Sequence, residues 1–200
     1  MSLFPMFVKL EERVCLVVGA GRVGESKIRS LVAAGARVRT VAPTATPAVA
    51  AWDRLGVLAW EGRAFQSADL EGAFLVVAAT SSPVVNDVIF REARQRRILC
   101  NVVDDPQRCD FYSPAVVRRG DLQIAISTAG RSPALAQRLR RRLELQFPAR
   151  CAGWVSALGR KRQMLLAEKL DPEYRRRLLH EIVSGAIPAD TAARKIRHGR

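Results

Sequence analysis

The apolar positions in the first half of the chain predict strands that alternate with helices. A continuous apolar run from Val14 to Val18 is typical of a strand that is buried on both faces. Apolar residues then recur at helical spacing between residues 23 and 32, and Gly35 stands where a helix C-cap is expected. A second strand is predicted at residues 36–42. Together these elements form a βαβ unit, which requires a parallel sheet.

The same alternation continues to about residue 112. The further helices and strands that the pattern predicts are helices at residues 46–56 and 82–97 and strands at residues 57–60, 74–79 and 98–103. This order of elements predicts an α/β fold, a Rossmann-type doubly wound parallel sheet, in a domain that covers residues 1–112.

The pattern changes in the second half of the chain. Residues 115–128 are typical of an antiparallel hairpin that turns at Arg119-Gly120-Asp121. The helices predicted after it lie at residues 132–147, 150–169, 172–184 and 188–197. We therefore expect a small α+β dimerisation region at 113–148 and a helical C-terminal domain at 149–200. These parts have little core of their own, so we expect burial against a second copy, as in a homodimer.

Segment length and cysteine use indicate a cytoplasmic protein. No segment approaches the ~20 apolar residues that a membrane-spanning helix needs, and the N-terminus lacks the features of a signal peptide. Four cysteines, Cys15, Cys100, Cys109 and Cys151, are dispersed without a C-x-x-C pair. They fit reduced thiols better than disulfides or a metal site, and no His or Cys cluster offers a dedicated metal site.

The positive charge is concentrated in the last third of the chain. The formal net charge is +14, of which residues 131–200 contribute +11 and residues 1–130 only +3. Such a field attracts polyanions: nucleic acid, anionic lipid or a polycarboxylate substrate. The alternative is a solvated surface in an arginine-rich proteome.

A glycine-rich turn follows the first predicted strand. "GAGRVG" places Gly19, Gly21 and Gly24 in the G-x-G-x-x-G pattern, directly before a predicted helix. In dinucleotide-binding proteins these glycines permit a tight turn, approach of the pyrophosphate and close helix–strand packing. The amides near Arg22 and Val23 would then point at the phosphates. The alternative is a glycine turn that serves packing alone.

The end of the second predicted strand leaves the choice between NAD and NADP open. NAD-binding proteins usually carry an acidic residue there, on the ribose hydroxyls. Here the chain has Pro43 and Thr44, without a carboxylate. Thr44 could bond a hydroxyl, and Arg39 could meet a 2′-phosphate.

The ends of two further strands supply candidate site residues. In a doubly wound sheet the ligand lies across the carboxyl ends of the strands, so Thr80 and Asn101 are expected to line the nicotinamide side. Asp104 follows just beyond, where a carboxylate could take a proton while a hydride leaves for the cofactor. The alternative is that Asp104 and Asp105 are turn residues before Pro106.

A second candidate ligand loop precedes the helix predicted at residues 132–147. Ser127, Thr128, Gly130 and Arg131 stand directly before the predicted helix cap Ser132. Hydroxyls, an arginine and free helix amides together suit an anion, so Ser127, Thr128 and Arg131 are candidate substrate-binding residues. An ordinary capped helix is the alternative.

Several stretches together resemble one family, the precorrin-2 dehydrogenases, which include the N-terminal part of siroheme synthases. The similar stretches are "FPMFVKLEERVCLVVGAGRVGESKI", "GARVRTVAP", "DLEGAFLVVAATSSPVVN", "NVVDDPQRCDFYSPAVVRRGDLQIAISTAGRSPALA" and "RLRRRLELQFP". They cover about residues 4 to 148, in order. The combination of "NVVDDP" with "ISTAGRSPALA" is more specific than the glycine motif.

The resemblance implies an activity and its residues. Members of the family oxidise precorrin-2 to sirohydrochlorin with NAD, on the route to siroheme, and some also insert ferrous iron as a ferrochelatase. They are homodimers. The family's essential aspartate falls on Asp104 and its NAD contacts fall on Arg22-Val23 and Pro43-Thr44. The tetrapyrrole substrate carries eight carboxylates, and a basic protein would concentrate it electrostatically.

One competing hypothesis belongs to another class of protein. A dinucleotide-sensing module could bind nucleic acid through the basic tail. However, no helix-turn-helix pattern is evident, and aromatic residues are not interleaved with the basic runs. The sequence therefore favours an enzyme that has no nucleic-acid partner and no membrane partner.

Overall fold

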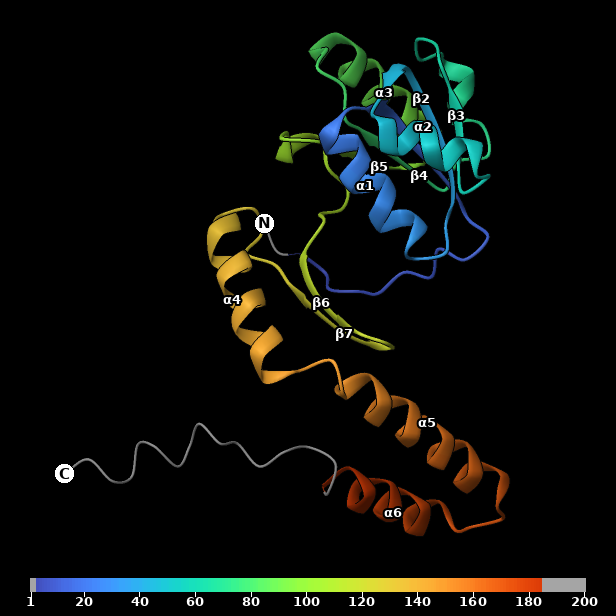
Figure 1. The fold of residues 1–200 in the computed structure, drawn as a ribbon, viewed down its shortest axis with the longest axis vertical. Helices are drawn as coiled ribbons and strands as arrows, with labels where there is room; N and C mark the ends of the chain where they lie inside the picture. Colours follow the sequence, from blue (N-terminus) through green and yellow to red (C-terminus); the bar gives the residue numbers. More distant parts are fainter. Residues whose placement is uncertain (1–2, 185–200) are drawn as a thin grey trace, which may run out of the picture. The chain divides into compact units, whose positions relative to one another are not determined.

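A computed structural model of the chain describes residues 3–184 and consists of two compact units. The first unit ends at Ser113, and the second begins at Pro114 (Figure 1). The helix predicted at residues 188–197 lies outside the described residues.

The first unit is a five-stranded parallel sheet with the strand order β3-β2-β1-β4-β5. Its strands are β1 (Val14–Ala20), β2 (Arg37–Ala45), β3 (Ala59–Glu61), β4 (Leu75–Ala78) and β5 (Leu99–Val102). Its helices are α1 (Arg22–Val32), α2 (Pro47–Arg54) and α3 (Pro83–Gln95), with 3₁₀ turns η1 (Ser67–Leu70) and η2 (Pro106–Arg108). The predicted Rossmann-type, doubly wound α/β fold is confirmed.

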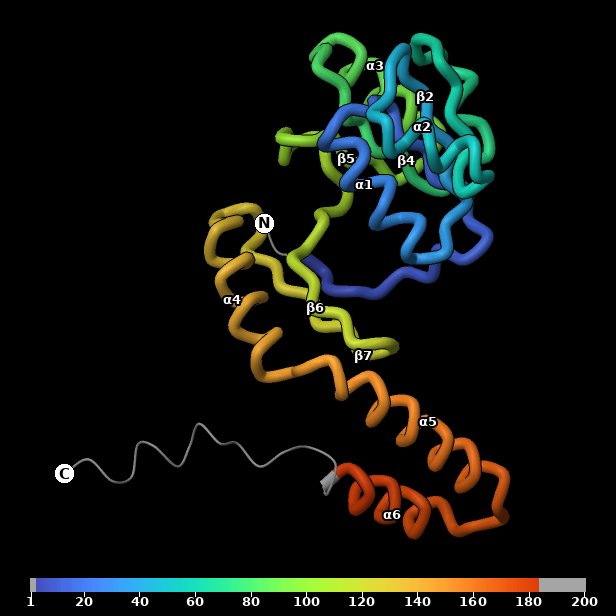
Figure 2. Tube along the Cα trace, in the orientation of Figure 1, coloured from blue at the N-terminus to red at the C-terminus, as the bar shows by residue number. Residues whose placement is uncertain are grey.

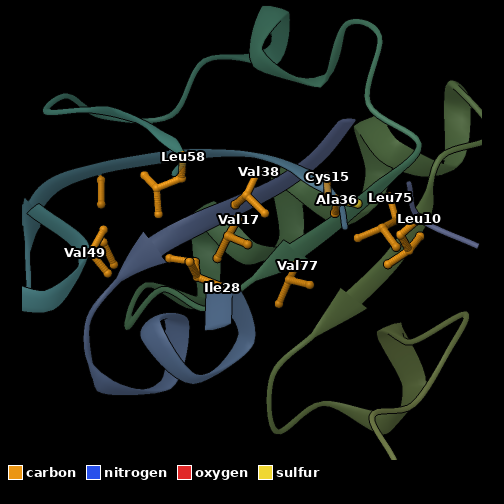
Figure 3. Close-up of a cluster of buried hydrophobic side chains, with 12 residues drawn as sticks. Leu10, Cys15, Val17, Ile28, Ala36, Val38, Val49, Leu58, Leu75 and Val77 are labelled. Carbon is orange, nitrogen blue, oxygen red and sulfur yellow. The ribbon is translucent and has the colours of Figure 1, made fainter. Parts of the chain in front are cut away.

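Both faces of this sheet are buried, because successive residues of the apolar strands point to opposite sides. Val17 and Val77 lie in one core cluster with Ile28 of α1 and Val49 of α2 (Figure 3). On the other face, the second cluster joins the neighbouring residues of the same strands to α3 and η1: Leu16, Val18, Val76, Ala78, Leu70, Ile89 and Ala93. The continuous apolar runs thus become a sheet covered by helices on both sides.

Strand β2 extends three residues beyond the predicted end at residue 42. Pro43 cannot donate a ladder hydrogen bond. Its fixed φ is nevertheless compatible with an extended chain, and β2 pairs again with β1 at Ala45 and Ala20 after an irregularity at Gly19. The polar end of β2 is therefore held in the sheet rather than in a free loop.

The second unit contains a hairpin and helices that pack on it and on one another. Strands β6 (Ala115–Arg119) and β7 (Leu122–Ile126) are antiparallel, as predicted, with φ of +59° at Gly120 in the turn. Helix α4 (Pro133–Gln146) contacts both strands, and α5 (Cys151–Ala167) contacts β7 and α6 (Pro172–Ser184). Figure 2 shows the course of the chain through these elements.

Arg119 closes the last turn of α4. Its guanidinium donates to the carbonyl oxygens of Phe147 at 2.6 Å and Glu144 at 3.2 Å. These bonds satisfy acceptors that a helix C-terminus leaves open. The hairpin and α4 are thereby joined by polar as well as apolar contacts.

The second unit buries little apolar surface. Among residues 114–184, the buried hydrophobic residues are Val117, Ala136 and Cys151. Leu135, Leu139 and Leu145 on α4 are exposed. No helix in the described part of the chain is both long and apolar enough to cross a membrane.

Candidate active site

In the glycine-rich turn between β1 and α1, two glycines are needed for the backbone packing of the protein. Gly19 has a φ of +101°, and a Cβ there would clash with the carbonyl oxygen of Ala79, just after β4. A Cβ at Gly24 would clash with the carbonyl oxygen of Gly19. Gly19 and Gly24 therefore let α1 start directly against the ends of β1 and β4.

The packing of the protein does not require a glycine at position 21. Its φ is −74°, and a Cβ there would meet nothing within 4 Å. Gly21 is also the N-cap of α1, which has no side-chain cap, whereas the side chains of Thr46, Ser82 and Ser132 cap α2, α3 and α4. Open space above uncapped amides fits the pyrophosphate of a dinucleotide, which a side chain at this position would obstruct.

The carboxyl ends of the strands bring the other candidate residues to the same edge of the sheet. In the sheet, β2 and β3 lie on one side of β1, and β4 and β5 lie on the other. The switch in strand order therefore falls between β1 and β4. The amide of Ala79 donates to Val18, and the amide of Val103 donates to Ala78. Pro43 and Thr44 are exposed at the end of β2, and Arg22 and Val23 are exposed at the start of α1.

Thr80 orders the loop after β4. Its hydroxyl donates to Asn86 Oδ1 at 2.7 Å and accepts the amide of Ser82 at 3.1 Å. Asn86 returns a bond from Nδ2 to the carbonyl oxygen of Thr80. Thr80 thus has a defined structural role, and the direct cofactor contact predicted for it stays a prediction.

Asn101 is buried, and its amide turns toward the segment that follows η2. Its Nδ2 donates to the carbonyl oxygen of Phe111 at 2.8 Å and lies 3.2 Å from Cys109 Sγ. Asp110 accepts the amide of Cys100 through Oδ2 at 2.9 Å. These bonds hold residues 109–111 along the edge of β5. Asn101 therefore supports the segment around Asp104, and its predicted contact with a cofactor stays a prediction.

Asp104 lies in a turn directly after β5, with a φ of +61°. Left-handed backbone is uncommon for residues other than glycine, although aspartate and asparagine tolerate it better than most. The side chain is exposed and makes no hydrogen bond or ion pair with residues 3–184. Asp105 differs, because its carboxylate accepts the amide of Gln107 and caps η2. The two neighbouring acids thus have different environments, and Asp104 is the one available to a ligand.

A charged network that the sequence did not indicate fixes this turn. Arg108 of η2 lies 3.1 Å from Asp87 of α3 and 3.5 Å from Asp105. Asp87 is also 3.0 Å from Arg91, one helical turn along α3. The turn that carries Asp104 is thereby fastened to α3 at one side and to β5 at the other.

Lys27 is a second charged residue that the sequence analysis missed. It projects from α1, where Gly24 and Ile28 are buried, and its Nζ donates to Ser113 Oγ at 3.0 Å. Burial lowers the pKa of Lys27, while the charges of Cys109 and Asp104 act in the opposite direction. Its position three residues after Gly24, next to the buried face of the helix, is the signal that could have drawn attention to it.

Comparison with known proteins agrees with this geometry. Residues 6–115 match a family model described as putative NAD(P)-binding, and residues 119–146 match one described as sirohaem biosynthesis protein central. The chain belongs to the family of precorrin-2 dehydrogenases and siroheme synthases. The resemblance inferred from the sequence motifs is confirmed.

Relatives of the family differ in length from this chain. Siroheme synthase 1 of Serratia proteamaculans (strain 568) is 40% identical over 162 residues, which are 81% of this chain and 34% of that protein. Siroheme synthase 1 of Aeromonas salmonicida (strain A449) is 37% identical over 184 residues, which are 92% of this chain and 39% of that protein. The chain thus spans between about a third and two fifths of these relatives.

One solved structure of similar length matches most of the chain. SirC, a precorrin-2 dehydrogenase, superimposes with a TM-score of 0.77 and 26% sequence identity, and the match covers 90% of this chain and 89% of SirC. The similarity therefore extends over both compact units. The comparisons give no support to the alternative of a nucleic-acid-binding sensor.

The loop predicted to bind an anion lies in the second unit, between β7 and α4. Ser127 Oγ accepts the amide of Ala129, and Thr128 Oγ1 accepts the amide of Ser132, at 3.1 and 3.0 Å. Ala129 and Gly130 both have positive φ, and Arg131 is exposed. The hydroxyls shape this turn as acceptors, which leaves their protons available for other acceptors. Substrate binding by Ser127, Thr128 and Arg131 stays a prediction.

Two remaining candidates concern the 2′-phosphate and metal ions. Arg39 lies in the first half of β2, paired with Leu16 of β1, and its guanidinium reaches Glu61 at 4.0 Å and the carbonyl oxygen of Glu71 at 3.4 Å. It is thus not at the carboxyl end of the strand, where a 2′-phosphate would lie. In residues 3–184, no group of three His, Cys, Asp or Glu side chains is arranged to hold a metal ion.

Proposed function

We propose that this chain is an NAD-dependent precorrin-2 dehydrogenase, which converts precorrin-2 to sirohydrochlorin. The observation that carries the proposal is the exposed, unpaired carboxylate of Asp104, at the same sheet edge as the open space above Gly21. The similarity to SirC over both units supports the same activity.

The reaction removes one hydride and one proton from precorrin-2. Bound NAD supplies the hydride acceptor, so the products are sirohydrochlorin, NADH and a proton. Asp104 takes the proton from the substrate and later releases it to water, which an exposed carboxylate at the mouth of the site can do. Asn101, Arg108 and Asp87 keep the turn of Asp104 in place.

The cofactor would be held by the residues at the strand ends. Gly19, Gly21 and Gly24 would admit the pyrophosphate to the amides at Arg22 and Val23, and the exposed Pro43 and Thr44 would face the ribose end. Thr80 and Asn101 would line the nicotinamide side of the same edge. Because Arg39 lies away from that ribose end, the arrangement favours NAD over NADP.

The substrate is a polycarboxylate, and its acidic side chains need cationic partners. Ser127, Thr128 and Arg131 suit carboxylates, since hydroxyl donors and a guanidinium are combined in one loop. The exposed leucines of α4 suit a homodimer, which would also give the second unit a larger core. The free cysteines fit a cytoplasmic protein.

Iron insertion is a second candidate activity, and two relatives that carry the name siroheme synthase favour it. Ferrous iron would enter as a substrate, bound by the pyrrole nitrogens of sirohydrochlorin. Asp104 could then accept the pyrrole N–H protons that the metal displaces.

One assay tests both activities. With precorrin-2 and NAD we expect the absorbance of NADH to rise, and the absence of a rise with authentic substrate would overturn the dehydrogenase. Addition of Fe²⁺ to the sirohydrochlorin formed then tests chelation. Siroheme formation at the same slow rate as without protein would exclude the second activity and leave the first intact.

A further inference from the structure

We propose that Lys27 is a binding residue for a carboxylate of the substrate, and that it orients the macrocycle against Asp104. This inference rests on the proposed function, because it names the partner of a cation in the same site. Lys27 was indicated by neither the glycine motif nor the strand ends. It comes from α1, the helix whose N-terminus would carry the cofactor phosphates.

The first argument is the lack of a counterion. Among residues 3–184, no carboxylate oxygen lies within 4.0 Å of Lys27 Nζ, and its hydrogen-bond partner is the neutral hydroxyl of Ser113. An ammonium has three donors, so two of them are left for other acceptors. Half-buried cations are usually paired, because removal from water disfavours their charged form.

The neighbouring thiol does not serve as that counterion. Burial raises the pKa of Cys109, so the thiol is neutral near pH 7. Cys109 Sγ is, in addition, within 3.2 Å of the carbonyl oxygens of Val102 and Asp105, which suits a donating S–H. The acid whose charge acts on Lys27 is therefore Asp104, which is exposed and outside ion-pair distance.

The second argument is the match between this pair and the reaction. A base must approach the reacting carbon while the acidic side chains of the same macrocycle are held elsewhere. A half-buried cation whose charge interacts with that of Asp104, and which has no carboxylate within 4.0 Å among residues 3–184, provides a fixed point for one of those carboxylates. A carboxylate bound to Lys27 would, in turn, favour its ammonium form and offset the effect of burial.

A competing role is purely structural. The bond from Lys27 to Ser113 holds the last residue of the first unit against α1. If this tether were the function of Lys27, removal of the hydroxyl would be as harmful as removal of the ammonium. The two roles therefore predict different results for two single substitutions.

The decisive experiment compares three variants. Lys27→Met keeps the stem and removes the charge, Ser113→Ala removes the tether and keeps the charge, and Lys9→Met removes the charge of an exposed lysine elsewhere in the same unit. We expect Lys27→Met to raise the KM for precorrin-2 and the Kd for sirohydrochlorin by about tenfold, with the Kd for NAD unchanged. Ser113→Ala and Lys9→Met should stay within about twofold of wild type.

Binding of sirohydrochlorin, followed by its change in absorbance, gives a readout that does not depend on turnover. Lys27→Arg should restore most of the affinity, because a carboxylate accepts bonds from either cation. Equal losses in Lys27→Met and Ser113→Ala would overturn the assignment in favour of the tether. A higher Kd for NAD with unchanged sirohydrochlorin binding would overturn it in favour of the cofactor.

The failure of this inference is separable from that of the proposed function. A wild-type protein that neither binds sirohydrochlorin nor reduces NAD with precorrin-2 would overturn the proposed function and the ligand assigned to Lys27. If wild type binds sirohydrochlorin and reduces NAD, and Lys27→Met does both equally well, only the inference about Lys27 is overturned.

Discussion

Arg108 Nη2 lies 3.1 Å from Asp87 Oδ1, which ties the turn after β5 to the helix that precedes it. The same guanidinium is 3.5 Å from Asp105, the residue next to Asp104. Since about a third of each of these side chains is exposed, the pair contributes little to global stability. Its effect is local, because it restricts the backbone on which the left-handed Asp104 depends.

Arg108→Ala is therefore expected to reduce kcat by about three- to tenfold, with less than about 1 kcal/mol lost in stability. NAD affinity should be unchanged, since the substitution leaves the glycine turn intact. Steady-state kinetics and thermal unfolding measure the two effects. Arg91→Ala is the matched control, because it removes the other partner of Asp87 and keeps Arg108. Equal losses in kcat for both variants would contradict a specific role of Arg108.

Asp104→Asn should lower kcat by about a hundredfold or more, because general bases typically contribute that much. Asparagine tolerates left-handed backbone, so the turn and the stability should be retained. NAD binding, measured by titration, should stay within twofold of wild type. Asp105→Asn is the control next to it. Its amide oxygen can still accept the amide of Gln107, and we expect most activity to remain. Full activity of Asp104→Asn would show that Asp104 is not the general base.

Strand ends and glycines could be predicted from the sequence because their signals are local. A strand such as Val14–Ala20 is apolar throughout only when both faces of its sheet are covered. A glycine-rich turn directly after such a strand is compatible with few folds, of which the dinucleotide-binding fold is one. The observed ends of the strands differ from the predicted ones by a few residues, chiefly in β2, which continues past Pro43. The hairpin was predictable for the same reason, since Gly120 separates two short apolar segments.

The residues around Asp104 were not predictable in this way. Lys27 of α1 donates a hydrogen bond to Ser113, which lies 86 positions further along the chain, so no local pattern in the sequence indicates this contact. In the sequence, Arg108 and Asp87 look like ordinary solvated charges, the first in a short turn and the second on a helix. The bond from Asn101 Nδ2 to the carbonyl oxygen of Phe111, ten positions further along the chain, was likewise not indicated by any pattern in the sequence. Such contacts depend on tertiary structure, and the spacing of hydrophobic residues along the chain does not indicate them.

Two glycines of one motif should respond differently to substitution. Gly21→Ser introduces a good N-cap at a position where a Cβ meets nothing within 4 Å, so stability should be kept or slightly raised. The side chain would occupy the space of the pyrophosphate, and we expect the Kd for NAD to rise about tenfold or more. Gly24→Ala would instead clash with the carbonyl oxygen of Gly19 and should cost about 2 kcal/mol in stability.

Isothermal titration with NAD and chemical unfolding separate these two effects. If Gly21→Ser binds NAD as well as wild type, the open space above α1 has another purpose. If Gly24→Ala is as stable as wild type, the contact between α1 and β1 is looser than the structure indicates.

Acid sensitivity of the first unit should depend on Asp69. Its buried carboxylate is bonded by the guanidinium of Arg63 and by the amide of Gln66, and these bonds hold its pKa below the ordinary value of 3.8. Because the pKa is lower in the folded than in the unfolded state, the contribution to stability is complete well above pH 3.8. It is lost as the pH falls through the folded pKa.

Asp69→Asn removes the charge and keeps an acceptor for Gln66. We expect a loss of about 2 kcal/mol at pH 7, less than for a fully buried pair, because 36% of the Arg63 side chain is exposed. Denaturant unfolding at pH 7 and near pH 3 measures this, and the gap between wild type and variant should narrow at the lower pH. Asp53→Asn serves as the control, since Asp53 caps the amide of Trp60 without an ion pair in the described residues. A gap of constant size at both pH values would show that Asp69 contributes through packing rather than through its charge.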